Sequence, residues 1–598
     1  MNIRWFLVAT IFLFWSCNQT IQPTLHWRFN LLGFLPHDEI RGVLLSDQPL
    51  KDLNLSLVDS TSGQIVEGTT LNYFTAPEWG SWHHYTFIFN PVQKSGYYQL
   101  RYNSKNQGTI RVGQNLYDEA KEIPLVFLRQ QRCGYNPFIG AYCHQADGKA
   151  FYGHVPDSSL VDARGGWHDA GDQLKYLITA SYVTTTMLKT YDLFGSTFVD
   201  SVDALGKPGK NGLADLLDEA KWGLDWIEKL HPAPDALYHQ VADDRDHVGW
   251  KWPTEDPSNF GWGPDTFRVV YGANGQPQGL GKYKSKATGV SNIAGRSAAA
   301  FALASRIWKS DLNDAQTALR YLKHAKELYE LGRKLPGYQQ GNSFGAPYRY
   351  NESTWEDDME WAAAELYATT GEKRYLEESW RYGRNFGPEG ILNRDTAEHY
   401  FQYPFMNYGH AALAEWTDQS VGDSLAAFYR TNFEKIKLKA QKNPYHVGIP
   451  FIWCSNNVLS AMLNQVIAYE RMTGDKSYHD LLVAGRDWLL GLNPWGTSMF
   501  TGIPADREYP LDVHTSIYAL SKVMVPGGLV DGPVMTPIFN SLIGLKMTDP
   551  DEFTPFQNQV CVYHDDIGDY STNEPTMCGS GTAMFWWGYF AQPLDQKQ

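Results

Sequence analysis

The stretch Gly165–Asp172 (GGWHDAGD) places two acidic residues, Asp169 and Asp172, three positions apart in a turn bracketed by glycines. An apolar run from Leu174 to Leu188 follows and predicts a helix, so the turn would deliver both carboxylates to one side of a helix start. One explanation for the aspartates is capping of that helix, because Asp is a favoured N-cap residue. The glycines instead indicate a close approach of the backbone to another group, as at a functional site.

A second acidic cluster lies near the other end of the chain, in residues 563–575 (YHDDIGDYSTNEP). Pro575 suits the first turn of a closing apolar helix, which would put Glu574 at the start of that helix. Glu is not a favoured N-cap, so capping explains this residue less well than it explains Asp172. Desolvation beside an apolar helix would raise the pKa of the carboxyl group, as a general acid requires near neutral pH.

Two carboxylate sites on one cleft predict hydrolysis of glycosidic bonds, in which one group protonates the leaving oxygen and the other activates water or attacks carbon. Aspartic-protease chemistry also uses two carboxylates, but the helical pattern of this chain does not suit it. The aromatic content of 14%, with 21 Trp and 35 Tyr, favours stacking on uncharged rings such as sugars. The net charge of -15 and the lack of a basic stripe argue against a nucleic-acid partner.

The periodicity of apolar residues divides the 598-residue chain into two regions. From about Leu25 to Val112, apolar and polar residues alternate, which predicts a small antiparallel β-sandwich of five to eight strands. After about Tyr117 the spacing changes to three and four, which predicts helices. The clearest helical runs are Leu213–Ile227, Ser297–Ile307, Tyr321–Leu331, Trp361–Tyr367, Asn457–Met472, Leu481–Leu490 and Ala583–Phe590. Long loops between them predict a toroid of helical hairpins with a cleft on one face.

Residues 1–17 (MNIRWFLVATIFLFWSC) combine Arg4 with a short apolar run, as in a secretory signal peptide. The end of this run resembles the lipidation box of bacterial lipoproteins, in which Cys17 would carry the lipid. We therefore expect an exported protein, either a cell-surface or periplasmic lipoprotein or a secreted protein. Such a lipid would be the only membrane attachment, because no other run is long and apolar enough to span a bilayer.

Beyond these patterns, the chain resembles glycoside hydrolase family 9, the cellulase family with an (α/α)6 barrel, and in particular its subgroup with an N-terminal immunoglobulin-like domain. Residues 165–172 match the family's aspartate motif, and residues 563–580 match a family signature. Further matches lie at Asn30–Pro36, Gln131–Gly134, Leu213–Trp226, Trp355–Gly371, Pro450–Asn457 and Gly491–Gly502. The resemblance implies an all-α barrel over residues 117–593, preceded by a small all-β immunoglobulin-like sandwich over residues 24–113.

The resemblance also implies catalytic roles. Asp172 would be the general base, Asp169 would help to hold the attacking water, and Glu574 would be the general acid. Because the family inverts the anomeric carbon, the carboxyl groups of Asp172 and Glu574 should lie about 6.5–9.5 Å apart. The implied reaction is endo-acting hydrolysis of β-1,4-glucosidic bonds in cellulose-like or mixed-linkage β-glucan. Two alternatives remain: an exo-acting β-glucosidase or glucosaminidase of the same family, and an inactive surface glycan-binding lipoprotein.

The chain departs from the family at two sugar-site positions. It keeps His514 but has Ser516 where the family signature has Arg, and Ser580 where the other signature ends in Asn. The missing Arg leaves the exact polysaccharide open. By family position, Trp453 and Tyr570 would contact sugar together with His514; the alternative is that both aromatic residues pack in the barrel core.

Cys133, Cys143, His144 and His168 form a possible metal site, because thiolate and imidazole ligands in this combination suit tetrahedral zinc. Enzymes of the subgroup resemble this arrangement, with a structural zinc near the aspartate motif. The alternative is a Cys133–Cys143 disulfide, which is plausible outside the cytoplasm. Calcium occurs in many relatives, but no loop of this sequence offers a set of oxygen ligands clear enough to assign residues to a calcium site. No organic cofactor is expected, and the sequence assigns no oligomeric state.

Overall fold

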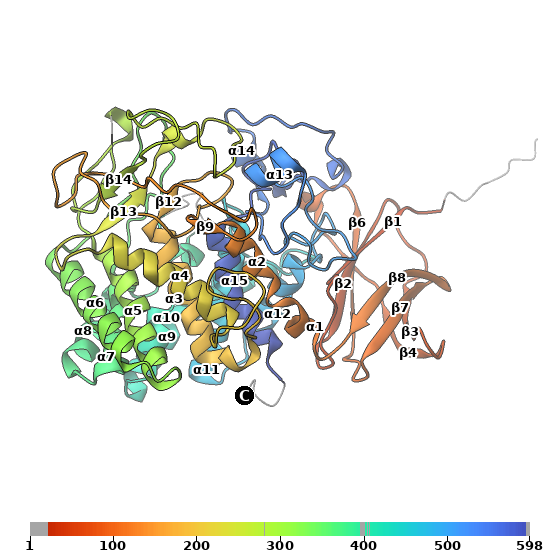
Figure 1. Cartoon of the computed structure of the whole chain (residues 1–598). Coiled ribbons are helices and arrows are strands. Elements are labelled where there is room, and N and C mark those ends of the chain that lie inside the picture. The colour runs from red at the N-terminus through yellow and green to blue at the C-terminus, as the bar shows by residue number, and fades with distance from the viewer. Residues whose placement is uncertain (1–21, 280, 395–400, 404, 406, 594–598) are drawn as a thin grey trace, which may run out of the picture.

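The structure is a computed structural model that describes residues 22–593, apart from 280, 395–400, 404 and 406. The predicted signal peptide and Cys17 lie outside the described residues. A β-sandwich stands beside a larger helical domain, and the loops that connect the helices gather on the upper side in Figure 1.

The N-terminal region forms two four-stranded antiparallel sheets, with strand orders β1-β2-β6-β5 and β4-β3-β7-β8. The strands are β1 Leu25–Phe29, β2 Ile40–Ser46, β3 Asn54–Asp59, β4 Ile65–Thr70, β5 Asn72–Phe74, β6 His83–Phe89, β7 Gly96–Tyr102 and β8 Lys105–Val112. Alternate side chains of β6, among them Tyr85, Phe87 and Phe89, are buried in the sandwich core. The period-two pattern is thereby confirmed.

The inner wall of the helical domain is a closed ring. Successive contacts run from α3 to α5, α7, α9, α11 and α15, and from α15 back to α3. These helices are α3 Leu177–Phe194, α5 Ser291–Ser310, α7 Glu356–Thr370, α9 Gly409–Ala414, α11 Ser455–Thr473 and α15 Met577–Ala591. Every residue of α15 is buried, which explains its nearly continuous apolar sequence.

A second layer of helices covers this ring. The outer helices are α1 Leu116–Ala120, α2 Ile123–Gln130, α4 Asp215–Leu230, α6 Ala315–Lys334, α8 Lys373–Phe386, α10 Gln419–Ala440 and α12 His479–Leu489. Helices α1 and α2 pack against α15, and the other outer helices pack each against the inner helix that precedes it in the chain. In the described residues, six inner helices with these outer partners make an (α/α)6 barrel, as predicted.

The remaining elements are short and lie mostly in the loops. The helices are α13 Ser516–Ser521 and α14 Thr536–Phe539, and 3-10 turns lie at Pro77–Trp79, Gly195–Thr197, Asp244–Asp246, Gly281–Tyr283, Ile391–Asn393 and Thr554–Phe556. The strands are β9 Tyr135–Asn136, β10 Ala141–Tyr142, β11 Lys149–Phe151, β12 Lys175–Tyr176, β13 Tyr238–Val241, β14 Val269–Gly272, β15 Val534–Met535 and β16 Cys561–Val562. The sheet β11-β14-β13-β12 belongs to the loop-rich side. Among the described residues, no helix has the length and apolar character needed to cross a bilayer.

Two predicted helix starts are wrong. The helix after the aspartates begins at Leu177 instead of Leu174, and its N-cap is Tyr176, so Asp172 does not cap it. The reason is that Lys175 and Tyr176 pair with β13 as the strand β12. At the other end of the chain, the closing helix begins at Met577 with Thr576 as its N-cap.

Pro575 therefore precedes the closing helix instead of lying in its first turn. Its position is explained by an isolated β-bridge to Val530, which holds the chain extended before the helix. Glu574 consequently lies in an extended segment three residues before Met577, the first residue of the helix.

The sandwich is fastened to the barrel through the C-terminal end of α12. Arg486 on α12 forms an ion pair with Asp38 of the sandwich at 2.8 Å, and both side chains are buried. The side-chain amide of Asn30 donates to the Asp487 carboxylate at 2.7 Å. Because these charged groups are removed from water, their partners are essential to the interface.

Candidate active site

The turn that carries the two aspartates depends on its glycines. Gly165 and Gly166 have φ values of 108° and 72°, in the region that favours glycine. Gly171 is restricted by space instead, since a Cβ atom there would lie 2.8 Å from Glu574 Oε1 and would press on the His514 carbonyl oxygen. The close approach expected from the glycines is therefore present.

Asp169 is buried and held through both carboxylate oxygens. The Thr179 hydroxyl donates to Oδ1 at 2.8 Å, and the Tyr350 hydroxyl donates to Oδ2. Burial and the nearby charge of Asp172 raise the pKa of Asp169 to about 7. This carboxylate has a fixed orientation and is easily protonated.

Asp172 is more open, with 20% of its side chain exposed. Its Oδ1 accepts the Leu174 backbone N–H at 2.9 Å, while its Oδ2 lies 3.7 Å from His247 Nε2. Burial and the charge of Asp246 raise the pKa of Asp172 to about 7. Asp172 therefore accepts a local hydrogen bond from Leu174 instead of capping the helix, and part of its carboxylate remains accessible.

Glu574, which lies near the other end of the sequence, contacts the turn that carries the two aspartates. The Gly171 backbone N–H donates to Glu574 Oε1 at 2.8 Å, across 403 positions of chain. Burial, followed by the charges of Asp531 and Asp172, raises the pKa of Glu574 well above its ordinary value. The two predicted carboxylate sites therefore adjoin.

The three predicted sugar-contact residues lie together beside the carboxylates. The rings of Trp453 and Tyr570 stack with centroids 5.5 Å apart, and the rings of His514 and Tyr570 meet edge to face at 6.2 Å. All three side chains are only partly buried. Trp453 also packs against the barrel core, as its alternative interpretation expected, and its contact with sugar stays a prediction.

The orientation of His514 follows from its hydrogen bond. Its Nδ1 lies 2.6 Å from the Ile567 carbonyl oxygen, which can only accept, so Nδ1 carries the hydrogen. Burial lowers the pKa of His514 to about 4, which keeps the ring neutral. Its Nε2 is then a hydrogen-bond acceptor.

The two serines at the departing positions have different surroundings. The Ser516 hydroxyl donates to the Gly171 carbonyl at 3.3 Å, which puts this residue against the turn that carries the two aspartates. Ser580 lies inside α15, where its hydroxyl accepts the Leu529 N–H at 3.0 Å and donates to the Thr576 carbonyl at 2.9 Å. Ser516 thus belongs to the site, whereas Ser580 supports the loop around it.

Several residues of the site were not predicted. The Asp531 carboxylate accepts the Trp453 indole N–H at 3.0 Å, and its backbone N–H donates to the Glu574 carbonyl at 2.9 Å. His247 stacks on Tyr348 with centroids 4.2 Å apart, and Trp250 meets His514 edge to face at 4.5 Å. These residues come from long loops, where no spacing pattern marks functional residues. The one signal that the sequence offers for them is the presence of aromatic residues in such loops.

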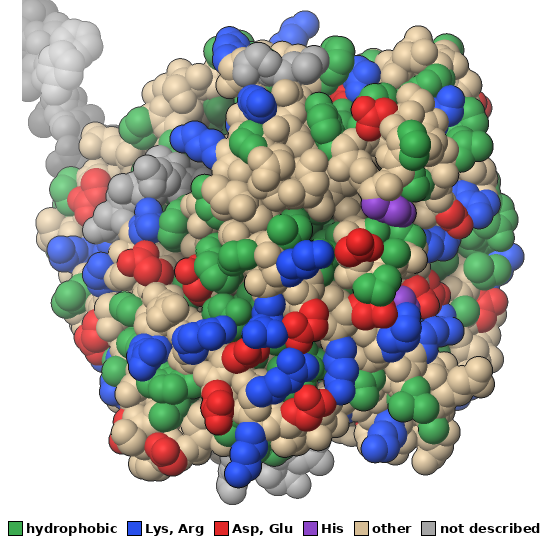
Figure 2. All heavy atoms as spheres, turned by 90° about the vertical axis from the view of Figure 1, so that its left-hand side faces the viewer, with side chains coloured by type: hydrophobic (Ala, Val, Ile, Leu, Met, Phe, Trp, Pro, Cys, Tyr) green, Lys and Arg blue, Asp and Glu red, His purple; other side chains and the backbone are tan. Residues whose placement is uncertain are grey.

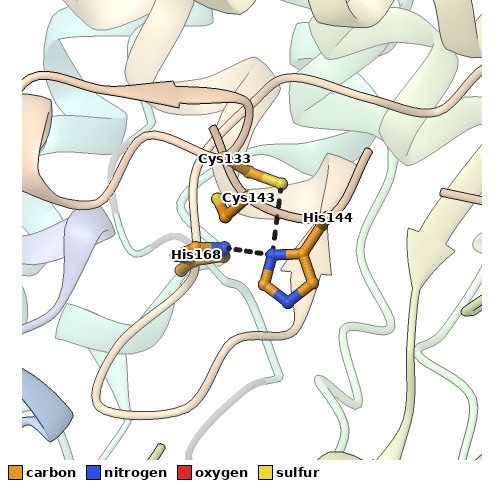
Figure 3. Close-up of side chains that lie close together, drawn as sticks. All are labelled: Cys133, Cys143, His144 and His168. Atoms are coloured by element: carbon orange, nitrogen blue, oxygen red, sulfur yellow. Dashed lines mark hydrogen bonds between the residues drawn. The ribbon is translucent and has the colours of Figure 1, made fainter. Parts of the chain in front are cut away.

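The four predicted metal ligands form a compact group (Figure 3). Their ligand atoms all lie within 4.8 Å of one another, with His168 Nε2 at 3.2 Å and Cys133 Sγ at 3.7 Å from His144 Nδ1. Cys133 and Cys143 are free cysteines, which contradicts the disulfide alternative. Two thiols and two imidazoles in this arrangement fit a tetrahedral zinc site.

Polar groups around these four residues fit the same interpretation. His144 Nε2 lies 3.2 Å from Asp256, so this carboxylate would fix the ring with Nδ1 turned inward, as is common for histidine ligands of zinc. The Lys175 ammonium lies 3.2 Å from Cys133 Sγ. Burial raises the pKa of the Cys133 thiol, but the hydrogen bond from Cys143 and the charge of Lys175 outweigh burial and hold that pKa well below its ordinary value.

The comparison with protein families decides the identity of the chain. A model described as glycosyl hydrolase family 9 matches residues 117–587. This chain belongs to glycosyl hydrolase family 9. Among its family 9 relatives, Endoglucanase 20 of Arabidopsis thaliana is 32% identical over 494 residues, which cover 77% of this chain and 91% of that protein. Endoglucanase 19 of the same plant is 30% identical over 425 residues, which cover 67% of this chain and 62% of that protein.

Solved family 9 structures share the fold over both domains. A metagenome-derived family 9 endoglucanase superimposes with a TM-score of 0.74 and 24% identity, and covers 95% of this chain and 99% of its own. A zinc-binding triple mutant of the family 9 endoglucanase J30 gives a TM-score of 0.73 and 23% identity, with 94% and 100% coverage. The sandwich followed by an (α/α)6 barrel is therefore an arrangement that this chain shares with other family 9 proteins.

Proposed function

We propose that this family 9 hydrolase cleaves internal β-1,4-glucosidic bonds in cellulose-like or mixed-linkage β-glucan, with inversion at the anomeric carbon. The observation that carries the proposal is the hydrogen bond from Gly171 to Glu574, which brings that carboxyl group next to Asp172. An acid and a base from separate elements would thus act on the same glycosidic bond. Relatives named endoglucanases support this choice of bond.

The environment of Glu574 suits a general acid. Burial, followed by the charges of Asp531 and Asp172, raises its pKa and favours the protonated form that a general acid needs. Because Oε1 accepts the Gly171 N–H, the proton belongs on Oε2, from which it passes to the leaving glycosidic oxygen. The Gly171 N–H then stabilises the carboxylate that remains.

Asp172 is the proposed general base. Its exposed oxygen takes a proton from water as that water attacks the anomeric carbon, while the Leu174 N–H holds the other oxygen. Asp169, fixed by Thr179 and Tyr350, aligns the same water. His514 Nε2 would accept a sugar hydroxyl, and the exposed faces of Trp453 and Tyr570 would stack on sugar rings.

The proposal is tested by measuring reducing-sugar release from a soluble β-glucan and sizing the products. Asp172→Ala should abolish release, and Glu574→Gln should remove the alkaline limb of the pH–rate profile. An endo enzyme should give mid-sized fragments early and should cleave oligosaccharides blocked at their ends. Inertness toward blocked ends would favour the exo alternative, and no release by the wild type would favour a glycan-binding protein.

Structural zinc is proposed for the Cys133, Cys143, His144 and His168 group. The Cys133 N–H donates to the Gly166 carbonyl at 2.8 Å, and His168 directly precedes Asp169, so a metal bound here would brace the catalytic turn. The ion would supply no catalytic step, since all four of its positions would be filled by side chains.

Export, with Cys17 as the lipid anchor, is proposed from residues 1–17. Expression in a bacterium with fractionation tests this assignment. The wild type should sediment with membranes and Cys17→Ser should appear in a soluble fraction. If the wild type and Cys17→Ser are distributed equally between the fractions, Cys17 does not anchor the protein through a lipid.

A further inference from the structure

Three potential metal ligands lie close together where the C-terminal end of α4 approaches α6. None of them belongs to the segment that carries the catalytic aspartates. His231 is the C-cap of α4, and His324 and Glu327 lie one helical turn apart on α6. One ligand atom from each lies within 4.8 Å of the other two. The rings of the two histidines are in edge-to-face contact, with centroids 5.5 Å apart.

The hydrogen-bond partners of the two rings define which nitrogens keep a lone pair. His231 Nδ1 lies 2.9 Å from the Ala236 carbonyl oxygen, and His324 Nε2 lies 3.2 Å from the Glu228 carboxylate. Both partners accept only, so these nitrogens carry the hydrogens. In the neutral rings, His231 Nε2 and His324 Nδ1 then carry the lone pairs.

These two lone-pair nitrogens are buried and lack hydrogen-bond partners among the residues that the structure describes. His231 is only 2% exposed. Glu327 Oε2 lies 3.7 Å from His231 Nε2, which is too far for a hydrogen bond. Two buried lone pairs beside a carboxylate would be satisfied by a proton on one ring, by a water molecule or by a metal ion.

Three features favour the metal. Each ring is held through its other nitrogen by a backbone carbonyl or a carboxylate, the arrangement common around metal-bound histidines. Imidazole and carboxylate ligands suit zinc and its neighbours in the first transition row. Finally, Lys323, which contacts Glu327 at 3.1 Å, is 65% exposed, so this ion pair holds the carboxylate only weakly.

We propose that His231, His324 and Glu327 bind a divalent transition-metal ion, with Zn²⁺ as the best fit. Three protein ligands leave a fourth position to water. The ion ties the end of α4 to α6. Beyond His231 the chain runs through β13 to the loop of His247, which faces Asp172, so the tie steadies the start of a segment that reaches the active site.

General surface charge would not account for such binding. On the face that lies to the left in Figure 1 and carries α6, Figure 2 shows Lys and Arg side chains intermingled with Asp and Glu side chains. No field of one sign covers this face, so affinity must come from the ligand geometry.

The test is equilibrium dialysis of the full chain against buffered free Zn²⁺, with metal and protein measured in the same sample. The comparison includes the wild type, His324→Gln, Glu327→Gln and, as a matched control on the same helix, Glu330→Gln. Glu330 pairs with Arg333 and Arg374 and lies outside the ligand group. The Cys133 group is present in all four proteins, so differences between them report on the proposed site alone.

The wild type and Glu330→Gln should bind one more equivalent of Zn²⁺ than His324→Gln. Glu327→Gln should bind that equivalent at least tenfold more weakly. Glu327 is only partly buried, so its variant keeps the test decisive if the histidine variant fails to fold. Identical zinc content in all four proteins would overturn the proposal and would leave a water molecule or a proton on one ring to satisfy the two nitrogens.

Discussion

Gly171 is the residue on which the site depends most directly. Its N–H holds Glu574, and its missing side chain leaves room for the His514 carbonyl. The glycine bracket in the sequence predicted this close approach, but its partner could not be identified from spacing, because that partner lies 403 positions away.

Gly171→Ala should therefore impair catalysis. The added methyl group must displace Glu574 or the His514 backbone, at a cost of about 1–3 kcal/mol, which corresponds to a loss of roughly 5–150-fold if it falls on the transition state. The measurement is kcat/KM on a soluble β-glucan. Gly422→Ala is the control, since a Cβ there meets nothing within 4 Å. Equal losses in both variants would contradict the role given to Gly171.

Asp531 should set the alkaline limb of the pH–rate profile. Burial raises the pKa of Asp531 to about 8, and once Asp531 is ionised its charge adds to burial in opposing ionisation of Glu574, so Asp531→Asn should lower the pKa of Glu574 and move that limb to lower pH. The acid limb, which reports ionisation of Asp169 and Asp172 with pKa values of about 7, should stay near that pH. The measurement is kcat/KM against pH. If the alkaline limb does not move, Asp531 does not influence the pKa of Glu574.

At the scale of elements, the sequence predicted the inner helices better than the outer ones. Runs such as Ser297–Ile307 are apolar on every side because α5 is buried all round. Helices α8 and α10 were missed because charged and polar residues dominate them. The start of α3 was misplaced for another reason: tertiary pairing with β13 overrode the local helical pattern.

The group of Cys133, Cys143, His144 and His168, for which zinc is proposed, is also an element-scale feature, because it joins the end of α2 to the turn that carries the aspartates. With His324→Gln present in every protein, so that the second proposed zinc site is absent, Cys133→Ser should lower the melting temperature, and a chelator should then lower it no further, since the metal would already be lost. Cys561→Ala is the matched control: it is another buried free cysteine, but it lies outside the group, so its variant should still respond to the chelator. Calorimetry of the three proteins gives the answer. A chelator response in Cys133→Ser would argue against zinc at this group.

At the scale of the molecule, the sandwich and the barrel share a buried ionic junction. Arg486→Ala would leave the carboxylates of Asp38 and Asp487 buried without their cation, at a cost of about 3–5 kcal/mol. Urea unfolding should record this loss. Lys94→Ala removes a 72% exposed partner of Asp59 within the sandwich and should cost far less, because solvent screens this pair. Similar values for the two variants would mean that Arg486 does not fasten the domains.

The order of domains and the acidic residues that meet at the candidate site could be predicted because motifs and periodicity are local in sequence. The contacts of Asp531, and the meeting of His231 with His324, arise where separate loops and helices pack together. No spacing within one segment encodes such contacts. They become visible only once the chain is folded.

The central claim is that Asp172 and Glu574 act as base and acid in an inverting reaction. Its most direct test is time-resolved proton NMR of the first products released from a soluble β-1,4-glucan. Inversion predicts that the α-anomer forms first and converts to the β-anomer only by later mutarotation. Initial release of the β-anomer would show a retaining reaction and contradict the roles assigned to both carboxylates.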